Sequence, residues 1–112
     1  MTDRELLELA AKAAGLEGFT YISDNPAYRA SHTGLQDWKR WNPLTDDGDA
    51  LRLAVTLRLE VNCTIPDKPT ISVYGNSNGR MVACHEDRRQ GDYAATRRAI
   101  VRAATEIGRQ MK

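Results

Sequence analysis

The spacing of hydrophobic and polar positions predicts a helix at the start of the chain. Thr2 and Glu5 form a capping box, in which the hydroxyl group accepts from the Glu5 amide and the carboxylate reaches back to Thr2. Gly15 suits the position just after a helix, where the left-handed conformation is common. The apolar positions recur at helical spacing at Leu6, Leu9, Ala10 and Ala13. Because the alanines are small, we expect close packing against a sheet or another helix.

Two patterns compete over residues 46–65. Pro43 and three acidic residues (Asp46, Asp47 and Asp49) are typical of the start of a helix, whose dipole favours anions in its first turn. Ala50, Leu53, Ala54 and Leu57 fit one helical face, yet every second position from Leu51 to Ile65 is apolar, as in a strand. The cap signals favour a helix over residues 46–58. The β-branched residues that follow favour a strand over residues 59–65.

The remaining third of the chain predicts a hairpin and a long helix. Residues 70–75 and 80–86 alternate as strands, and Asn78-Gly79 suits the positive φ angles of the turn between them. Residues 66–68 form the preceding turn, so the strand over residues 59–65 completes a meander. A helix begins near Asp92 with an apolar face of Ile100, Ala103, Ala104, Ile107 and Met111, and Gly108 is expected to fray its end.

Residues 18–44 have no clear periodicity. A short strand is expected over residues 19–22, with loops over residues 23–26 and 32–34, and the segment holds a further strand or short helix or is a functional loop. Trp38 and Trp41 are spaced to share a helical face, and we favour a role in clamping this segment onto the core over stacking on a ligand. The whole pattern predicts a single α+β domain over residues 1–112. We expect a layered α/β/α-type sandwich with a small antiparallel sheet of three or four strands and about three helices.

Composition and charge narrow the class of protein. Of the 112 residues, 41% are hydrophobic and 28% charged, as in ordinary globular proteins. The start of the chain is acidic and helical, unlike a signal peptide, and no long apolar run predicts a membrane span, so a cytoplasmic protein is expected. Residues 1–50 carry five basic and nine acidic side chains, whereas residues 87–112 carry seven and three. The net charge of +1 is too small for a dedicated duplex-DNA binder.

The candidate chemical groups favour structural roles. The three acids at positions 46, 47 and 49 lack the ligand spacing of a calcium loop and suit helix capping better than Mg²⁺ or Ca²⁺ binding. Cys63 and Cys84 lie in apolar alternating contexts, which favours buried thiols in strands over a disulfide or a metal site. His32 and His85 are candidate acid–base residues, but sequence alone brings no third catalytic group to either of them. We therefore predict no metal site, no cofactor and no catalytic residue.

Two segments resemble a known family. DGDALRLAVTL over residues 47–57, preceded by WNPLTDD and followed by a meander, and then YAATRRAIVRAATEIG over residues 93–108, resemble small phage and prophage proteins of the phage ABA sandwich family. The resemblance covers residues 1–14 and 41–112. It implies an α/β/α layered domain and an accessory protein, without an established activity, expressed in an infected or lysogenic bacterial cell.

These observations favour a non-enzymatic protein-interaction module. The partner is expected to be a host or phage protein, with a homodimer as one form of the chain. The predicted contact surface consists of Trp38, Lys39, Arg40 and Trp41 together with Arg98 and Arg102. Replacing both of these arginines with alanine is then expected to weaken partner capture without lowering the melting temperature. The alternatives are a binder of a small anionic ligand such as a nucleotide and, least favoured, a hydrolase that uses His85.

Overall fold

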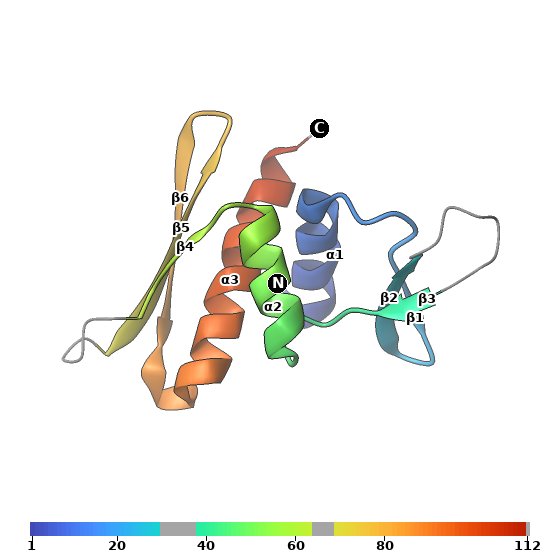
Figure 1. Cartoon of the computed structure of the whole chain (residues 1–112), viewed down its shortest axis with the longest axis horizontal. Coiled ribbons are helices and arrows are strands. Elements are labelled where there is room, and N and C mark those ends of the chain that lie inside the picture. The colour runs from blue at the N-terminus through green and yellow to red at the C-terminus, as the bar shows by residue number, and fades with distance from the viewer. Residues whose placement is uncertain (30–37, 64–68, 112) are drawn as a thin grey trace.

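The computed structural model describes residues 1–29, 38–63 and 69–111. Its elements are α1 (Asp3–Ala14), β1 (Thr20–Ile22), β2 (Asn25–Arg29), β3 (Trp38–Arg40), α2 (Asp47–Thr56), β4 (Glu60–Asn62), β5 (Thr70–Ser77), β6 (Arg80–Asp87), a short 3₁₀ helix η1 (Arg88–Gln90) and α3 (Asp92–Gln110). Within these residues, antiparallel strands form two sheets, β1-β2-β3 and β4-β5-β6. Figure 1 shows the three α-helices between the two sheets, with α3 against β4-β5-β6. The predicted α+β layered fold is confirmed.

Helix α1 has the predicted ends. The capping box between Thr2 and Glu5 is present, and Gly15 has a left-handed φ of 72°. The amide of Leu16 donates to the carbonyl of Ala11 over 3.1 Å, which closes the last turn. The buried face consists of Leu6, Leu7, Ala10 and Ala11. The predicted close contact is with another helix, because α1 lies against α3.

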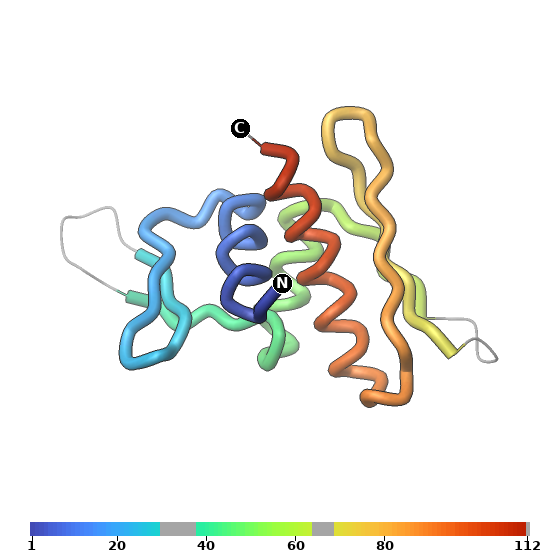
Figure 2. Tube along the Cα trace, turned by 180° about the vertical axis from the view of Figure 1, so that it is seen from behind, coloured from blue at the N-terminus to red at the C-terminus, as the bar shows by residue number. Residues whose placement is uncertain are grey.

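Helix α3 continues straight through Gly108, so the prediction that this glycine frays the helix is wrong. Gly108 is buried, and a Cβ atom placed on it would lie 2.1 Å from the carbonyl oxygen of Leu9 in α1. The glycine therefore permits two backbones to approach each other closely. Figure 2 shows α3 between α1 on one side and the β5–β6 hairpin on the other. No helix in the described part of the chain has both the length and the apolar character that crossing a bilayer requires.

Helix α2 begins as predicted and ends two residues early. The Asp46 carboxylate accepts from the Asp49 amide over 2.7 Å, which makes Asp46 the N-cap. The helix ends at Thr56, because Arg58 takes a left-handed φ of 55° that turns the chain into β4. Strand β4 covers residues 60–62, and the predicted strand residues 64 and 65 lie outside the described residues.

The hairpin β5–β6 has the predicted turn residues. Asn78 and Gly79 both have positive φ, 53° and 84°, and the strands extend to Ser77 and Arg80 on either side of them. The sheet face toward α3 is apolar and buried, with Ile71, Val73, Val82 and Cys84, whereas Met81, Ala83 and His85 are exposed on the other face. The predicted turn over residues 66–68 lies outside the described residues.

The small sheet β1-β2-β3 corrects two predictions. Ser23 and Asp24 form a two-residue turn with φ of 50° and 65°, so Asn25 and Pro26 belong to strand β2 and not to a loop. Trp38 begins strand β3, so it does not share a helical face with Trp41. The predicted clamp is confirmed for Trp41, which is 6% exposed and belongs to the hydrophobic core. The predicted loop over residues 32–34 lies outside the described residues.

Candidate functional site

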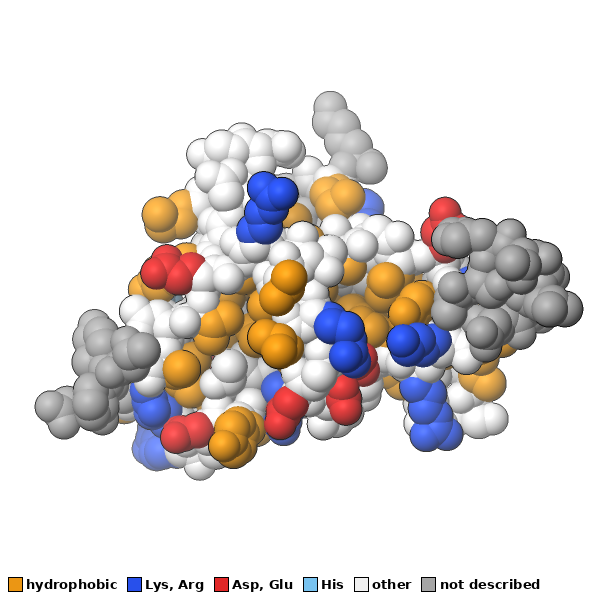
Figure 3. Space-filling view, viewed as in Figure 1, with side chains coloured by type: hydrophobic (Ala, Val, Ile, Leu, Met, Phe, Trp, Pro, Cys, Tyr) orange, Lys and Arg blue, Asp and Glu red, His pale blue; other side chains and the backbone are white. Residues whose placement is uncertain are grey.

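Strand β3 and helix α2 face each other across a hollow of about 470 Å³, which we call the β3–α2 cleft. Its lining residues come from β2, β3, the connection to α2 and α2 itself: Asn25, Pro26, Lys39, Arg40, Trp41, Asn42, Thr45, Asp46, Asp49 and Arg52. A smaller hollow of about 160 Å³ adjoins it and shares Lys39, Trp41, Asp49 and Arg52. Figure 3 shows basic side chains gathered between α2 and the β1-β2-β3 sheet.

The segment between β3 and α2 folds locally in a way that the sequence explains. The Trp41 amide donates to the carbonyl of Pro26 over 3.0 Å and so extends the pairing of β3 with β2. The Asn42 side-chain oxygen then accepts from the Leu44 amide over 3.1 Å, and the Asn42 carbonyl accepts from the Asp46 amide over 2.9 Å. This turn at Asn42 leads directly into Asp46, the N-cap of α2. Hydrogen bonds therefore hold the floor of the cleft on both sides of Trp41.

The acids of the cleft are occupied by contacts within the chain. Asp49, with 9% of its surface exposed, accepts from the Asn42 amide over 3.0 Å and from the Arg52 guanidinium over 2.7 Å. Asp46 caps α2 and lies 3.8 Å from Arg52. The hydrogen bond to Asp49 raises the pKa of Arg52 above its ordinary value, so this guanidinium stays charged. Arg52 thus forms ion pairs with both Asp46 and Asp49.

The two cations on β3 differ from Arg52. Lys39 and Arg40 are exposed, and neither side chain forms an ion pair or hydrogen bond with another residue that the structure describes. Because Asp46 and Asp49 pair with Arg52, no carboxylate in the described part of the cleft pairs with Lys39 or Arg40. The rim of the cleft on the β3 side can therefore attract an anionic group.

The two tryptophans have different surroundings. Trp41 is buried and meets the ring of Phe19 edge to face, with centroids 5.8 Å apart, so it supports the floor of the cleft and cannot stack on a ligand. Trp38 is half-buried and packs beside Gly18, and the Arg29 guanidinium lies 5.6 Å from its ring centroid. Trp38 lines a neighbouring hollow, which shares Arg40 with the β3–α2 cleft.

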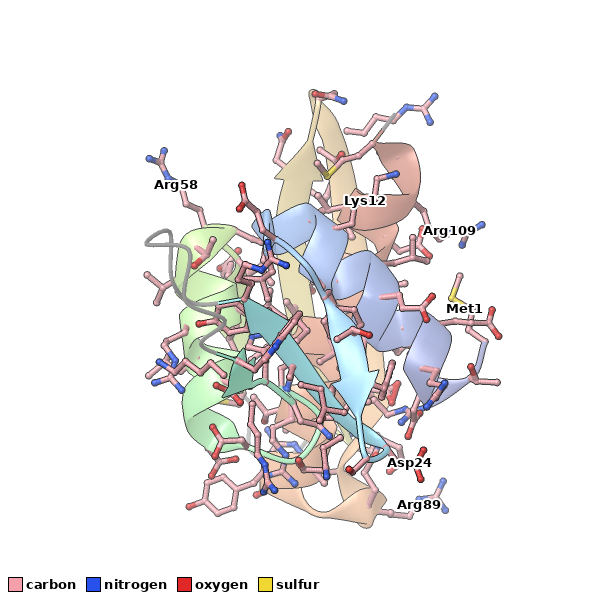
Figure 4. All side chains as sticks on the ribbon, turned by 90° about the vertical axis from the view of Figure 1, so that its right-hand side faces the viewer. Met1, Lys12, Asp24, Arg58, Arg89 and Arg109 are labelled. Atoms are coloured by element: carbon pink, nitrogen blue, oxygen red, sulfur yellow. The ribbon has the colours of Figure 1, made fainter. Side chains whose placement is uncertain are left out.

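Arg98 and Arg102 lie elsewhere. They line a separate hollow of about 380 Å³ between α1, α3 and β6, together with Met1, Leu6, Cys84, Thr105, Glu106 and Arg109. This hollow shares no lining residue with the β3–α2 cleft, and Figure 4 shows Met1 and Arg109 on the opposite side of the molecule from Arg58, which follows α2. The structure therefore does not bring the predicted arginines together with Lys39 and Arg40.

Both arginines are held by a carboxylate. The side chain of Glu86 is 12% exposed and forms ion pairs with Arg98, at 3.4 Å, and with Arg102. Arg98 also reaches Asp3 over 3.4 Å, and Arg102 donates to the backbone carbonyl of His85 over 3.2 Å. Arg109 pairs with Glu106 over 2.9 Å. Each of these cations has a counter-ion, so the hollow carries little excess charge.

The histidine and cysteine predictions have mixed outcomes. The His85 Nδ1 atom lies 2.7 Å from the Ser72 hydroxyl on the exposed face of the β4-β5-β6 sheet. Cys84 points to the opposite face, as predicted, and burial raises the pKa of its thiol. Cys63 is exposed after β4, so the prediction of a buried thiol is wrong there. His32 lies outside the described residues.

The sequence patterns considered above did not identify Asp49 and Arg52 as a pair, nor Asn42 as a residue of the site. The spacing of three residues between Asp49 and Arg52 was a usable signal for a helical ion pair. Strand β2, which supplies one wall of the cleft, could not be recognised in the sequence because Asn25 and Pro26 are typical of a loop.

No family model, curated protein or solved structure matches this chain. Membership of the phage ABA sandwich family therefore stays a prediction.

Proposed function

We propose that this chain is a non-enzymatic binding module that holds an acidic segment of a partner protein in the β3–α2 cleft. One observation carries the proposal: Lys39 and Arg40 stand next to each other on β3 without an acidic partner among the described residues, whereas the acids of the cleft are engaged with Arg52. A carboxylate from outside would complete this arrangement of charges.

The shape of the cleft supports the same proposal. It is an open hollow with a hydrophobic floor at Trp41 and Pro26 and a charged rim, which suits a segment with both acidic and apolar side chains. The buried floor is held by backbone hydrogen bonds, so binding requires little ordering of the site. The resemblance to phage proteins adds that the partner is a host or phage protein in the cytoplasm of a bacterial cell.

The test is charge reversal at the rim. The probe is a synthetic glutamate-rich peptide, and its binding to wild type and to the K39E/R40E variant is measured by calorimetry at low and physiological salt. Since the variant replaces two attractions by two repulsions, we expect about tenfold weaker binding or more, with the difference shrinking as salt rises. The same pair of proteins is then compared in capture of partners from bacterial lysate.

The matched control is R80E/R89E. It makes the same change in net charge at two exposed arginines that do not line the cleft. If the control loses as much peptide binding as K39E/R40E, net charge and not the cleft is responsible and the proposal is wrong. Equal binding by wild type and K39E/R40E also contradicts it.

A small anionic ligand is the second candidate. The volume of about 470 Å³ is within the range of small-molecule sites, and Lys39 and Arg40 suit a phosphate group. Because Trp41 is buried, such a ligand would be held through its phosphates and not by stacking. Titration of ATP with calorimetric detection separates the two candidates: tight ATP binding that K39E/R40E abolishes, without peptide binding, favours the nucleotide.

A further inference from the structure

Helix α2 is hydrophobic on two sides. Its inner face buries Ala50, Leu53 and Ala54, while Leu51 and Val55 on its outer face are 64% and 69% exposed. Figure 3 shows hydrophobic side chains over α2 at the centre of the face that the helix presents. The outer side of α2 therefore carries two large apolar side chains that no other described residue covers.

The outer residues form a line with opposite charges at its ends. Asp47, Leu51 and Val55 are four residues apart and follow one another along the helix. Arg58 lies just past the end of the helix, is exposed, and has no ion-pair partner among the residues that the structure describes. Figure 4 shows its side chain extending away from the molecule. We call the line of Asp47, Leu51, Val55 and Arg58 the α2 stripe.

We propose that the α2 stripe is a two-fold contact between two copies of this chain, with the two α2 helices packed antiparallel. A surface that is acidic at one end, apolar in the middle and basic at the other end is complementary to itself after a two-fold rotation. Antiparallel packing also places the opposite ends of the two helix dipoles together. No other orientation of two identical stripes matches both the charges and the apolar centre.

The spacing of the residues fits this contact. Leu51 and Val55 lie about 3 Å above and below the level of Leu53 along the axis, so Leu51 of one copy meets Val55 of the other. Arg58 then reaches the level of Gly48 in the other copy, beside two acids that are exposed although each also pairs with an arginine of its own chain, Arg52 or Arg97. Those acids are Asp46 and Asp47, whose side chains are 57% and 68% exposed.

The contact is small, which determines the kind of dimer. Tyr93, which is 76% exposed, lies one turn before Arg97, and Arg97 pairs with Asp47 over 2.6 Å, so Tyr93 extends the stripe at its acidic end. Even so, a helix of ten residues is about 15 Å long, and a pair of such helices buries less than the roughly 1,200 Å² of a stable complex. We therefore expect a reversible dimer that depends on concentration.

Sedimentation equilibrium of the wild-type chain, from about 1 µM to about 1 mM, tests the proposal. We expect the wild type to dimerise within this range and the L51Q/V55Q variant to raise the dissociation constant at least about tenfold. Both positions are exposed, so the variant keeps its fold, which circular dichroism checks. R58E is expected to weaken the dimer several-fold at low salt and less at high salt.

The matched control is M81Q, which removes a 77%-exposed side chain from the open sheet face. A dimer that M81Q weakens as much as L51Q/V55Q overturns the proposal, as does a wild type that stays monomeric at about 1 mM. A monomer that floats with phosphatidylcholine vesicles would assign the α2 stripe to a lipid surface instead. Because the dimer does not use Lys39 or Arg40, K39E/R40E should dimerise like wild type, which separates this proposal from that of the cleft.

Discussion

Replacing Gly108 with alanine tests whether the contact between α1 and α3 outweighs helix propensity. A Cβ atom at this position would lie 2.1 Å from the carbonyl oxygen of Leu9, which is backbone and cannot rotate away. The two helices must therefore separate by roughly 1 Å, in a region packed at the density of a crystal. The same movement stretches the 2.9 Å hydrogen bond from the Thr105 hydroxyl to the carbonyl of Leu6.

The magnitude follows from two opposing terms. Alanine is favoured over glycine inside a helix by about 1 kcal/mol, whereas overpacking a core costs about 1–3 kcal/mol or more. Because the obstacle is a backbone atom, the cost lies at the upper end, and we expect G108A to lose about 1–2 kcal/mol of unfolding free energy. For a chain of this length the melting temperature then falls by roughly 4–10 °C.

Urea and thermal unfolding, followed by far-ultraviolet circular dichroism, measure this loss. G48A is the matched control, because the nearest atoms to its Cβ are side-chain atoms, led by the end of the Arg52 side chain at 3.2 Å, and not backbone, so it should be neutral or slightly stabilising. If G108A is as stable as wild type, or if G48A is equally harmful, the close approach of α1 and α3 does not limit stability and the reasoning is refuted.

Two further predictions concern β6 and its neighbours. R98A/R102A should lower the unfolding free energy by about 1–3 kcal/mol, because Glu86, with its side chain 12% exposed, loses both guanidinium partners; the earlier expectation of an unchanged melting temperature does not fit these contacts. With a maleimide reagent near neutral pH, Cys63 should label fast in the native protein and Cys84 only on unfolding. Cys63 is exposed, whereas burial raises the pKa of the Cys84 thiol and so lowers its thiolate fraction, an effect that nearby Arg102 offsets in part.

Each of these predictions has a control in the chain. R109A removes an arginine whose ion pair with Glu106 is exposed on both sides, so it should change the unfolding free energy by no more than about 0.5 kcal/mol. A similar loss in R109A and R98A/R102A would mean that the burial of Glu86 is not the cause. For the thiols, the C63S variant should show only the slow reaction, and a fast phase in that variant would contradict the burial of Cys84.

The helix ends and the hairpin turn were predictable because their signals are local. Thr2 and Glu5 cap α1, Asp46 caps α2, and Asn78-Gly79 turns the chain between β5 and β6, each through atoms a few residues apart. The chemistry of such a motif depends little on what lies beyond it. The apolar face of α3 was predictable for the same reason, since periodicity alone assigns its side chains to the core.

Strands β2 and β3 were not predictable, because their pairing decides them. Asn25 and Pro26 have the composition of a loop, and Trp38 has a spacing to Trp41 that suits a helix. Their extended conformation comes from registers such as Ala27 against Thr20 on one side and Arg40 on the other. Strand propensity depends on such context more than helix propensity does.

The alternating apolar residues over positions 51–57 separate what the sequence determined from what the tertiary structure decided. The sequence by itself determined that α2 would start at Asp46 and carry apolar residues at positions 51, 53, 55 and 57. Only the tertiary structure decided that Leu53 lies in the core while Leu51 and Val55 are exposed. It also decided that Arg98 and Arg102 have counter-ions, whereas Lys39 and Arg40 have none among the described residues. Capping and periodicity act within a few residues along the chain. Burial and charge pairing depend on which segments distant in sequence come together, and no local pattern encodes that.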